Sequence, residues 1–201
     1  MNARHPLPGQ TTPAPGARGG WGLVLAALLF PGAMAGLTLK ELNDDPKLNP
    51  KRFASHFSEF AFELNLPIQA PETFLRRRCG DCDDYAVLAD LVLKPKGFTT
   101  RLIQVKLAGQ IDHAVCYVTE SGAYLDYNNR TVFFTLARSG ATVREIAAKV
   151  ADSLELNWTS AFEFEYTGRK KVLLYTVVKT EPAANDPAPG QRKENAVKVN
   201  F

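Results

Sequence analysis

The chain has 201 residues, of which 45% are apolar and 22% are charged. This is ordinary usage for one globular domain, and it excludes a fibrous, collagen-like or wholly disordered chain. Three cysteines are too few for a disulfide scaffold. Outside the first 35 residues, which contain Arg4 and Arg18 but no acid, 22 basic residues face 21 acidic ones. No concentrated basic stripe is present, so we expect no nucleic-acid partner.

The N-terminal 35 residues have the parts of a secretory signal peptide. A weakly basic, Pro- and Gly-rich lead is followed by ten uncharged residues from Trp21 to Phe30, and small residues stand at Ala33 and Ala35. We therefore expect residues 1–35 to be a signal peptide cleaved near Ala35, and the protein to be secreted or periplasmic, with no stable membrane span after cleavage. The alternative is an uncleaved membrane anchor, because the stretch from Gly19 to Leu39 carries no charge.

The rest of the chain divides into a domain of residues 36–180 and a tail of residues 181–201. The tail is dominated by Pro, Ala, Asn and charged residues, and this composition predicts a flexible segment. Its last residues, 196–201, alternate weakly between apolar and polar and could add an edge strand.

The first part of the domain favours helices. Asn49-Pro50 resembles a helix start, and apolar side chains at spacings of three and four then predict an amphipathic helix as far as Leu64. We interpret His56, on its apolar face, as a packed or half-exposed side chain. A second helix is expected to begin near Asp81, as N-cap, and to end at Pro95 and Gly97. It is apolar almost all round and should be central and buried.

The second part of the domain favours strands. Their expected ranges are 99–107, 113–118, 123–127, 131–136, 162–166 and 171–178, with a capping box at Thr142–Glu145 that opens a helix to about residue 151. The last two strands should form a hairpin over Thr167-Gly168. Helices followed by an antiparallel sheet predict an α+β domain.

Cys82 has the position of a reactive thiol. At the first turn of a buried helix, the unpaired amides and the helix dipole favour the thiolate. A thiolate attacks carbonyl groups, and adjacent amide hydrogens can hold the resulting oxyanion. Asp83 and Asp84 would oppose thiolate formation unless their carboxylates point away.

His113 and Asp126 could complete a catalytic set with Cys82. Strand alternation places His113 on the face opposite to Cys116, and a hairpin would bring Asp126 onto a strand beside that of His113. A carboxylate there can accept the imidazole N–H, fix its tautomer and leave the other ring nitrogen for the cysteine. We expect His113 near the Cys82 sulfur, and Asp126 at hydrogen-bond distance from the far ring nitrogen.

At these residues the sequence resembles a known family. The stretches APETFLRRRCGDCDDYAVLADLVL, GFTTRLIQV, DHAVCYV and AYLDY, spread over roughly residues 50–130, are similar to the bacterial transglutaminase-like cysteine proteinase group of the papain-related, transglutaminase-like superfamily. The resemblance implies Cys82 as nucleophile, His113 as base and Asp126 as its orienter. It also implies a papain-like, transglutaminase-core fold with the catalytic helix packed on an antiparallel sheet, and a protein or peptide substrate.

Two further expectations come with the resemblance. An upstream side chain often completes the oxyanion hole in such enzymes, and Gln69 is the candidate here. We expect no metal or cofactor, since no acid cluster resembles the calcium sites of animal transglutaminases.

Other uses of these residues stay open. Cys79 and Cys82 form a C-x-x-C pair that could act in redox chemistry or form a bridge that gates the nucleophile, and the rival is an inert Cys79. Cys79, Cys82, His113 and Cys116 are zinc-ligand types, although His113 and Cys116 should face opposite ways. Cys116 alone suits a buried small apolar residue. A catalytically inactive binding module with the same fold is the alternative to an enzyme.

Overall fold

The computed structural model describes residues 36–64, 67–128 and 136–191. The predicted signal peptide, nearly all of the strand expected at 131–136 and the edge strand expected at 196–201 lie outside these ranges. The helices are α1 (Leu39–Asp44), α2 (Pro50–Ser55), α3 (Pro71–Arg77), α4 (Cys82–Leu93) and α5 (Val143–Ser153). The strands are β1 (Ala61–Phe62), β2 (Cys79–Gly80), β3 (Thr100–Leu107), β4 (His113–Val118), β5 (Ala123–Leu125), β6 (Ala137–Arg138), β7 (Trp158–Thr167) and β8 (Lys170–Val178).

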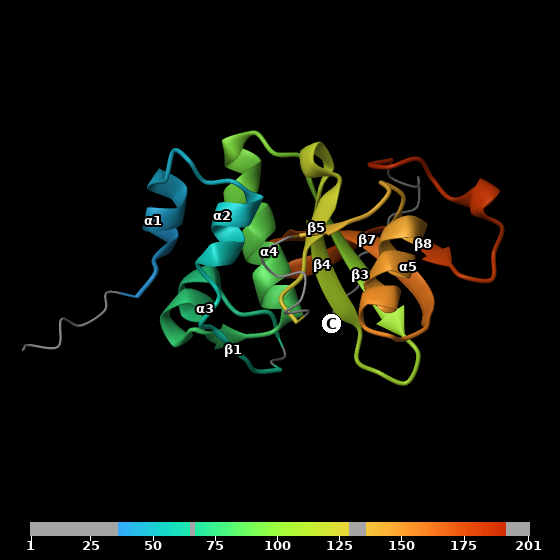
Figure 1. Ribbon diagram of the computed structural model, residues 1–201, viewed down its shortest axis with the longest axis horizontal. Coiled ribbons are helices and arrows are strands. Elements are labelled where there is room, and N and C mark those ends of the chain that lie inside the picture. Colours follow the sequence, from blue (N-terminus) through green and yellow to red (C-terminus); the bar gives the residue numbers. More distant parts are fainter. Residues whose placement is uncertain (1–35, 65–66, 129–135, 192–201) are drawn as a thin grey trace, which may run out of the picture. The chain divides into compact units, whose positions relative to one another are not determined.

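Six of the strands form one antiparallel sheet in the order β6-β5-β4-β3-β7-β8 (Figure 1). β3 and β4 pair in register along their length, with Ile103 opposite Val115 and Val105 opposite His113. The predicted hairpin between β7 and β8 is confirmed. It turns at Gly168 and Arg169, and both have positive φ, as a two-residue hairpin turn requires.

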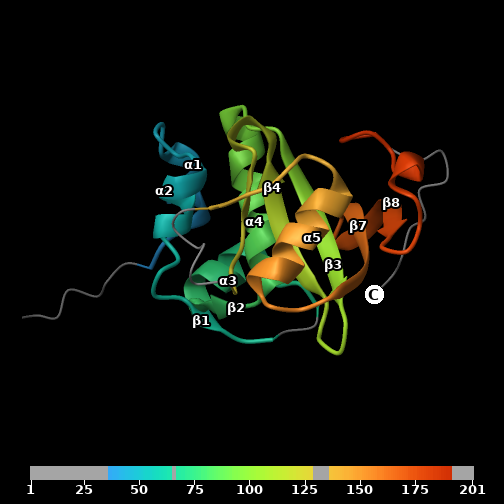
Figure 2. The same cartoon turned by 45° about the vertical axis from the view of Figure 1, so that its right-hand side comes forward.

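The two faces of this sheet are covered by different helices. Ala114, Cys116 and Val118 of β4 pack into a core with α4, whereas Val115 and Tyr117 pack into a second core with α5. Figures 1 and 2 show α4 and α5 on either side of β3 and β4. The strand alternation read from the sequence is therefore correct, and the α+β class with a helix packed on an antiparallel sheet is confirmed.

The helix expected at residues 50–64 is much shorter than predicted. Asn49 caps α2 as expected, with its side chain accepting the Arg52 N–H, but α2 ends at Ser55. The chain then turns, and β1 pairs in parallel with β2. The aromatic spacing is real but serves packing, since Phe57 is buried in a turn and Phe60 is buried directly after it, neither in a helix.

The central helix α4 begins and ends as predicted. Asp81 is its N-cap, and the chain leaves it through a 3₁₀ turn to Gly97, whose φ is 87°. The sequence also contains start signals for two helices that we did not predict. Thr38 and Glu41 form a capping box for α1, and Pro71 occupies the first position of α3.

The segment after residue 180 differs at its start from the flexible tail that we expected. A short 3₁₀ turn runs from Ala183 to Asn185. The Arg144 guanidinium donates two hydrogen bonds to the Asp186 carboxylate, at 2.6 and 2.9 Å, and others to carbonyl oxygens at the end of β8. A bidentate pair of this kind fixes the segment to α5.

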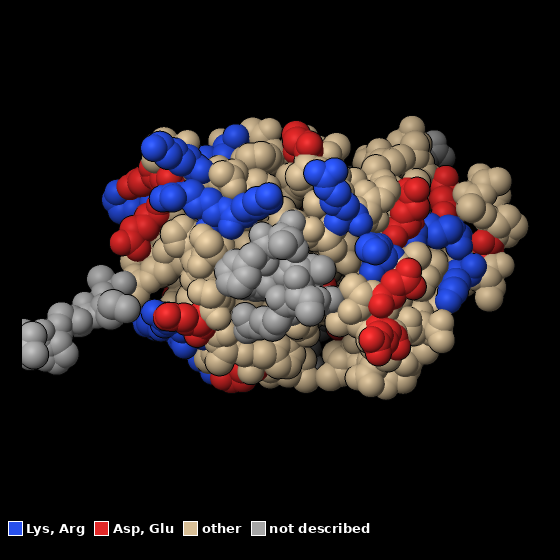
Figure 3. Space-filling view, viewed as in Figure 1, with Lys and Arg blue, Asp and Glu red and all other residues tan. Residues whose placement is uncertain are grey.

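On the face in Figure 3, the described acidic and basic side chains are intermixed, in keeping with the near-balanced composition. None of the helices in the described ranges is long and apolar enough to cross a membrane. The exposed large apolar side chains in these ranges are Phe62, Leu64, Leu91 and Ile111.

Candidate active site

The first turn of α4 holds Cys82 at a helix N-terminus that is closed by its own acids. The Asp81 carboxylate accepts the backbone N–H groups of Asp83 and Asp84, and the Asp84 carboxylate accepts the N–H of Asp81. This reciprocal capping fixes the direction of the turn. The capping bonds do not use the N–H of Cys82. Cys82 itself is 7% exposed.

Gly80 allows β2 to approach α4 closely. A Cβ at this position would lie 2.4 Å from an Asp84 carboxylate oxygen and 2.7 Å from the Phe74 ring, which is too close for any side chain. The glycine of the Gly-Asp-Cys motif therefore has a packing reason: it lets the chain pass the capping carboxylate before it enters the helix.

The carboxylates of Asp83 and Asp84, which follow Cys82, both accept hydrogen bonds. Asp84 accepts the backbone N–H and the side-chain amide of Gln69, each at 2.7 Å, as well as the N–H of Asp81. Asp83 accepts the ammonium group of Lys171 at 2.9 and 3.0 Å. Each carboxylate is therefore directed to partners of its own, Asp84 to amide groups and Asp83 to a cation.

The side chains of His113, the first residue of β4, and of Asp126, which directly follows β5, lie together. Nε2 of His113 is 2.9 Å from Oδ1 of Asp126, and both side chains are almost fully buried. Oδ1 also accepts the backbone N–H of Asn128, a local turn that holds the carboxylate. Tyr127, which lies between Asp126 and Asn128, anchors this turn. Its hydroxyl donates to the Ala61 carbonyl oxygen, and its ring stacks on Tyr85 of α4.

The Cys82 side chain lies near enough to His113 to affect the pKa of its imidazole. Because Nε2 faces Asp126, the other ring nitrogen, Nδ1, is left for the cysteine. Burial lowers the pKa of His113, but the Asp126 carboxylate and the Cys82 side chain outweigh it and raise the pKa to about 10. The imidazole is therefore able to hold a proton at neutral pH, between an acid and a thiol. The structure thus brings Cys82 close to the bonded pair of His113 and Asp126.

A comparison with protein families matches residues 44–137 to the transglutaminase-like domain. This part of the chain is therefore similar to the transglutaminase-like family. The matched range includes Cys82, His113 and Asp126, and it ends before α5, β7 and β8. A comparison with curated proteins found no match.

Gln69, which lies in the matched range, does not have the geometry that we expected of an oxyanion-hole residue. Its side-chain amide group donates to the Cys79 carbonyl oxygen at 3.1 Å and to Asp84 at 2.7 Å, and its carbonyl oxygen accepts from Arg77. An amide group has two hydrogens, and both are engaged. Gln69 therefore ties the segment before α3 to the start of α4, and the oxyanion-hole prediction is corrected to this structural role.

The other two cysteines have separate surroundings. The Cys79 thiol donates to Glu63 Oε2 at 3.1 Å, and this hydrogen bond, followed by burial, raises the pKa of Cys79. Cys116 is fully buried beside α4, as its apolar interpretation expected, and burial raises its pKa. All three cysteines are free. Among the described residues, no group of three His, Cys, Asp or Glu side chains is arranged to hold a metal ion.

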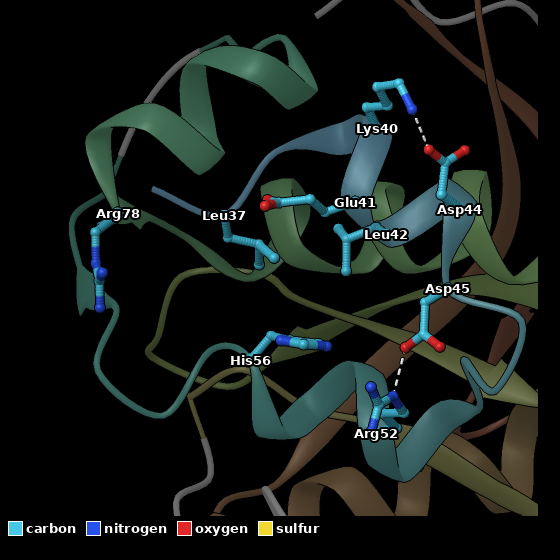
Figure 4. Close-up of a pocket in the computed structure, with 9 residues that line it drawn as sticks. All are labelled: Leu37, Lys40, Glu41, Leu42, Asp44, Asp45, Arg52, His56 and Arg78. Atoms are coloured by element: carbon cyan, nitrogen blue, oxygen red, sulfur yellow. Dashed lines mark hydrogen bonds and ion pairs between the residues drawn. The ribbon is translucent and has the colours of Figure 1, made fainter. Parts of the chain in front are cut away.

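A hollow of about 640 Å³ lies apart from these residues, between α1, α2 and Arg78 (Figure 4). Its charged side chains are largely paired, Lys40 with Asp44 and Arg52 with Asp45. His56 is half-buried at its floor, in agreement with the plain interpretation, and burial followed by the Arg52 charge lowers its pKa. Since neither Cys82 nor His113 lines this hollow, we do not assign the thiol chemistry to it.

Proposed function

We propose that the protein is a thiol enzyme that cleaves or transfers the acyl group of an amide or peptide bond. The observation that supports this most is the buried 2.9 Å bond between His113 and Asp126, with Cys82 near enough to raise the pKa of the same imidazole. Nucleophile, base and orienter are the three roles that acyl transfer by a thiol needs.

In the proposed reaction the Cys82 sulfur attacks the substrate carbonyl carbon. A C–S bond forms, and the carbonyl electrons move to the oxygen, which the N–H of Cys82 can bind because the capping bonds leave it out. The proton taken from the thiol rests on His113, whose pKa of about 10 keeps it there at neutral pH. As the C–N bond breaks, His113 gives this proton to the leaving amine.

The acyl-Cys82 intermediate is then released by a second nucleophile. His113 removes a proton from water or from an amine, the new bond forms at the carbonyl carbon, and Cys82 leaves as the thiolate. Water gives a peptidase or amidase, and an amine gives crosslinking. Asp126 does not change its protonation in this scheme; it keeps the imidazole oriented and stabilises its charged form.

An acylation experiment tests the proposal. Incubated with p-nitrophenyl acetate, the full chain should release nitrophenol in a burst and carry the acetyl group on Cys82, as located by peptide mapping. Cys82→Ala should abolish the burst, whereas Cys116→Ala should keep it, because Cys116 is buried in the core. Added hydroxylamine separates the two outcomes: hydroxamate formation favours amine acceptors, and acetate alone favours hydrolysis. No burst from a folded, reduced wild type would favour an inactive binding module and would refute the proposal.

The same proposal places the enzyme outside the cytoplasm. It rests on the order of a basic lead, the apolar run from Trp21 to Phe30 and the small residues before Gly36. N-terminal sequencing of the protein from its native host should begin at or near Gly36. An intact Met1 or Asn2 on cytoplasmic material would refute the export.

A further inference from the structure

A lysine from β8 reaches the first turn of α4. The Nζ of Lys171 lies 2.9 and 3.0 Å from the two carboxylate oxygens of Asp83 and 2.6 Å from Oε1 of Gln104 on β3. It also lies 5.0 Å from the centroid of the Phe164 ring. The side chain is only 10% exposed. Lys171 is 88 residues from Asp83 in the chain and lies beyond the part that matches the family.

The position of Asp83 gives this lysine its significance. Asp83 directly follows Cys82, and a carboxylate beside a thiol disfavours the thiolate. Asp84, the other acid of this turn, is held by neutral donors, namely the amides of Gln69 and Asp81. Lys171 supplies a full positive charge to Asp83, in a setting where little water screens the pair.

We propose that Lys171 is a positioning residue of the Cys82 site, which neutralises Asp83 and so favours the reactive thiolate. This rests on the proposed function, because it assigns a role in the chemistry of Cys82. In this role the lysine acts through Asp83, and Gln104 holds it in place by accepting a hydrogen bond from its ammonium group.

The other charged and titratable groups around this turn come from several elements, and they stay constant in the comparison below. They are Asp81 and Asp84 of α4, His113 of β4, Asp126 after β5, Asp112 beside Gln104, and Tyr166 of β7. A change confined to Lys171 or Asp83 therefore reports on their pair.

The test is the rate of Cys82 alkylation by iodoacetamide, measured from pH 5 to 10 on the full chain, with peptide mapping to separate Cys82 from Cys79 and Cys116. In Lys171→Met, the midpoint of the rate profile should move to higher pH by about one unit, and the rate at pH 7 should fall about tenfold. Asp83→Asn should move the midpoint in the opposite direction, because it leaves the cation beside the thiol. The double variant should return close to wild type.

Two controls separate a charge effect from a packing effect. Lys170→Met removes a cation from the adjacent, exposed position of β8 and should leave the profile unchanged. Lys171→Arg should keep the wild-type midpoint, because it keeps the charge. Should Lys171→Met fail to fold, Asp83→Asn and the double variant, which lack an unpaired acid beside the thiol, still carry the test.

The outcomes are distinguishable from a failure of the proposed function. If wild-type Cys82 reacts no faster than an unfolded thiol and ignores His113→Asn, the proposed function is wrong. If wild-type Cys82 is reactive and depends on His113, but Lys171→Met and Asp83→Asn leave the midpoint in place or move it the same way, Lys171 is structural only and this inference is overturned.

Discussion

The sheet contains two buried pairs of an acid and a nitrogen base that look alike in burial and distance. His113 and Asp126 approach to 2.9 Å, and Arg101 and Glu163 approach to 2.6 Å, with all four side chains almost inaccessible to water. Both pairs join neighbouring parts of the antiparallel sheet. Burial and pairing alone therefore do not separate a structural pair from a functional one.

The difference lies in what the base does with its remaining donors. The Arg101 guanidinium also donates to the hydroxyl of Tyr175 and to the carbonyl oxygen of Ala141. Its N–H groups are therefore used to hold neighbouring parts of the structure together. An arginine stays protonated at any ordinary pH. His113 instead has the Cys82 thiol nearby, and an imidazole can both give and take a proton. One pair can stabilise the fold; the other can move a proton.

The largest effect should come from breaking the pair at His113. In His113→Asn, alkylation of Cys82 by iodoacetamide at pH 7 should fall by about 10²- to 10⁴-fold, the usual contribution of a positioned acid or base. Peptide mapping reports the rate at Cys82 alone. Glu163→Gln is the matched control, and it should leave that rate unchanged in the folded protein. A rate in His113→Asn equal to the wild-type rate would make the two pairs equivalent and both structural.

Breaking the other pair should appear in stability instead. Glu163→Gln leaves the Arg101 charge buried without its counter-charge, which costs about 3–5 kcal/mol in the free energy of unfolding. Urea denaturation measures the loss. Glu165→Gln on the same strand is exposed and should change stability by less than about 0.5 kcal/mol. Equal stabilities for the two variants would contradict the structural role of the pair.

A smaller effect separates the pairs by pH. The Asp126 carboxylate and Cys82, opposed by burial, raise the pKa of His113 from 6.5 to about 10. Because the folded value is higher than the unfolded one, the stabilisation is fully present below about pH 6.5 and is lost as the pH rises through about 10. The free energy of unfolding should therefore fall over this range in the wild type.

The difference in the free energy of unfolding between the wild type and His113→Asn isolates this contribution, because the other groups titrate in both proteins. Burial also raises the pKa of Cys116, for example, and this affects both stability curves above about pH 9. Urea titrations of the two proteins at pH 6, 8 and 9.5 should converge with rising pH. Parallel curves would show that His113 gains no charge-dependent stabilisation from Asp126.

Local signals in the sequence were sufficient for the start of α4 and for much of the sheet. Asp81 at a helix start, alternation around Cys116 and the turn at Gly168 each act over a few residues, and each has the predicted place in the fold. The prediction of a helix up to Leu64 was wrong. The aromatic side chains are buried in the irregular segment before β1, and the pairing of β1 with β2 that ends the helix early is a tertiary contact.

The long-range partners could not be read from the sequence. Gln69 was a candidate for the oxyanion hole because of the family resemblance, and nothing in the sequence indicated that its amide would bind Cys79 and Asp84. Lys171 gave no signal at all, since an isolated lysine in a strand is ordinarily solvated, and its partner Asp83 is far away in the chain.

The smallest effect should come from Cys79, which tests whether the proposed site needs activation. The redox hypothesis requires a Cys79–Cys82 bridge under oxidising conditions, and then wild type would react with a thiol probe only after reduction. In the structure the Cys79 thiol donates to Glu63, and this bond, together with burial, raises its pKa. A thiol held in the protonated form is a poor partner in disulfide exchange.

We therefore expect Cys79→Ser, whose hydroxyl can make the same bond to Glu63, to label at Cys82 without reductant at the wild-type rate, within about twofold. The readout is probe incorporation by mass spectrometry after air oxidation. If only the variant were labelled, and the wild type reacted only after reductant was added, the hypothesis of a gating Cys79–Cys82 bridge would be supported. The reactivity of Cys82 would then depend on redox state as well as on His113.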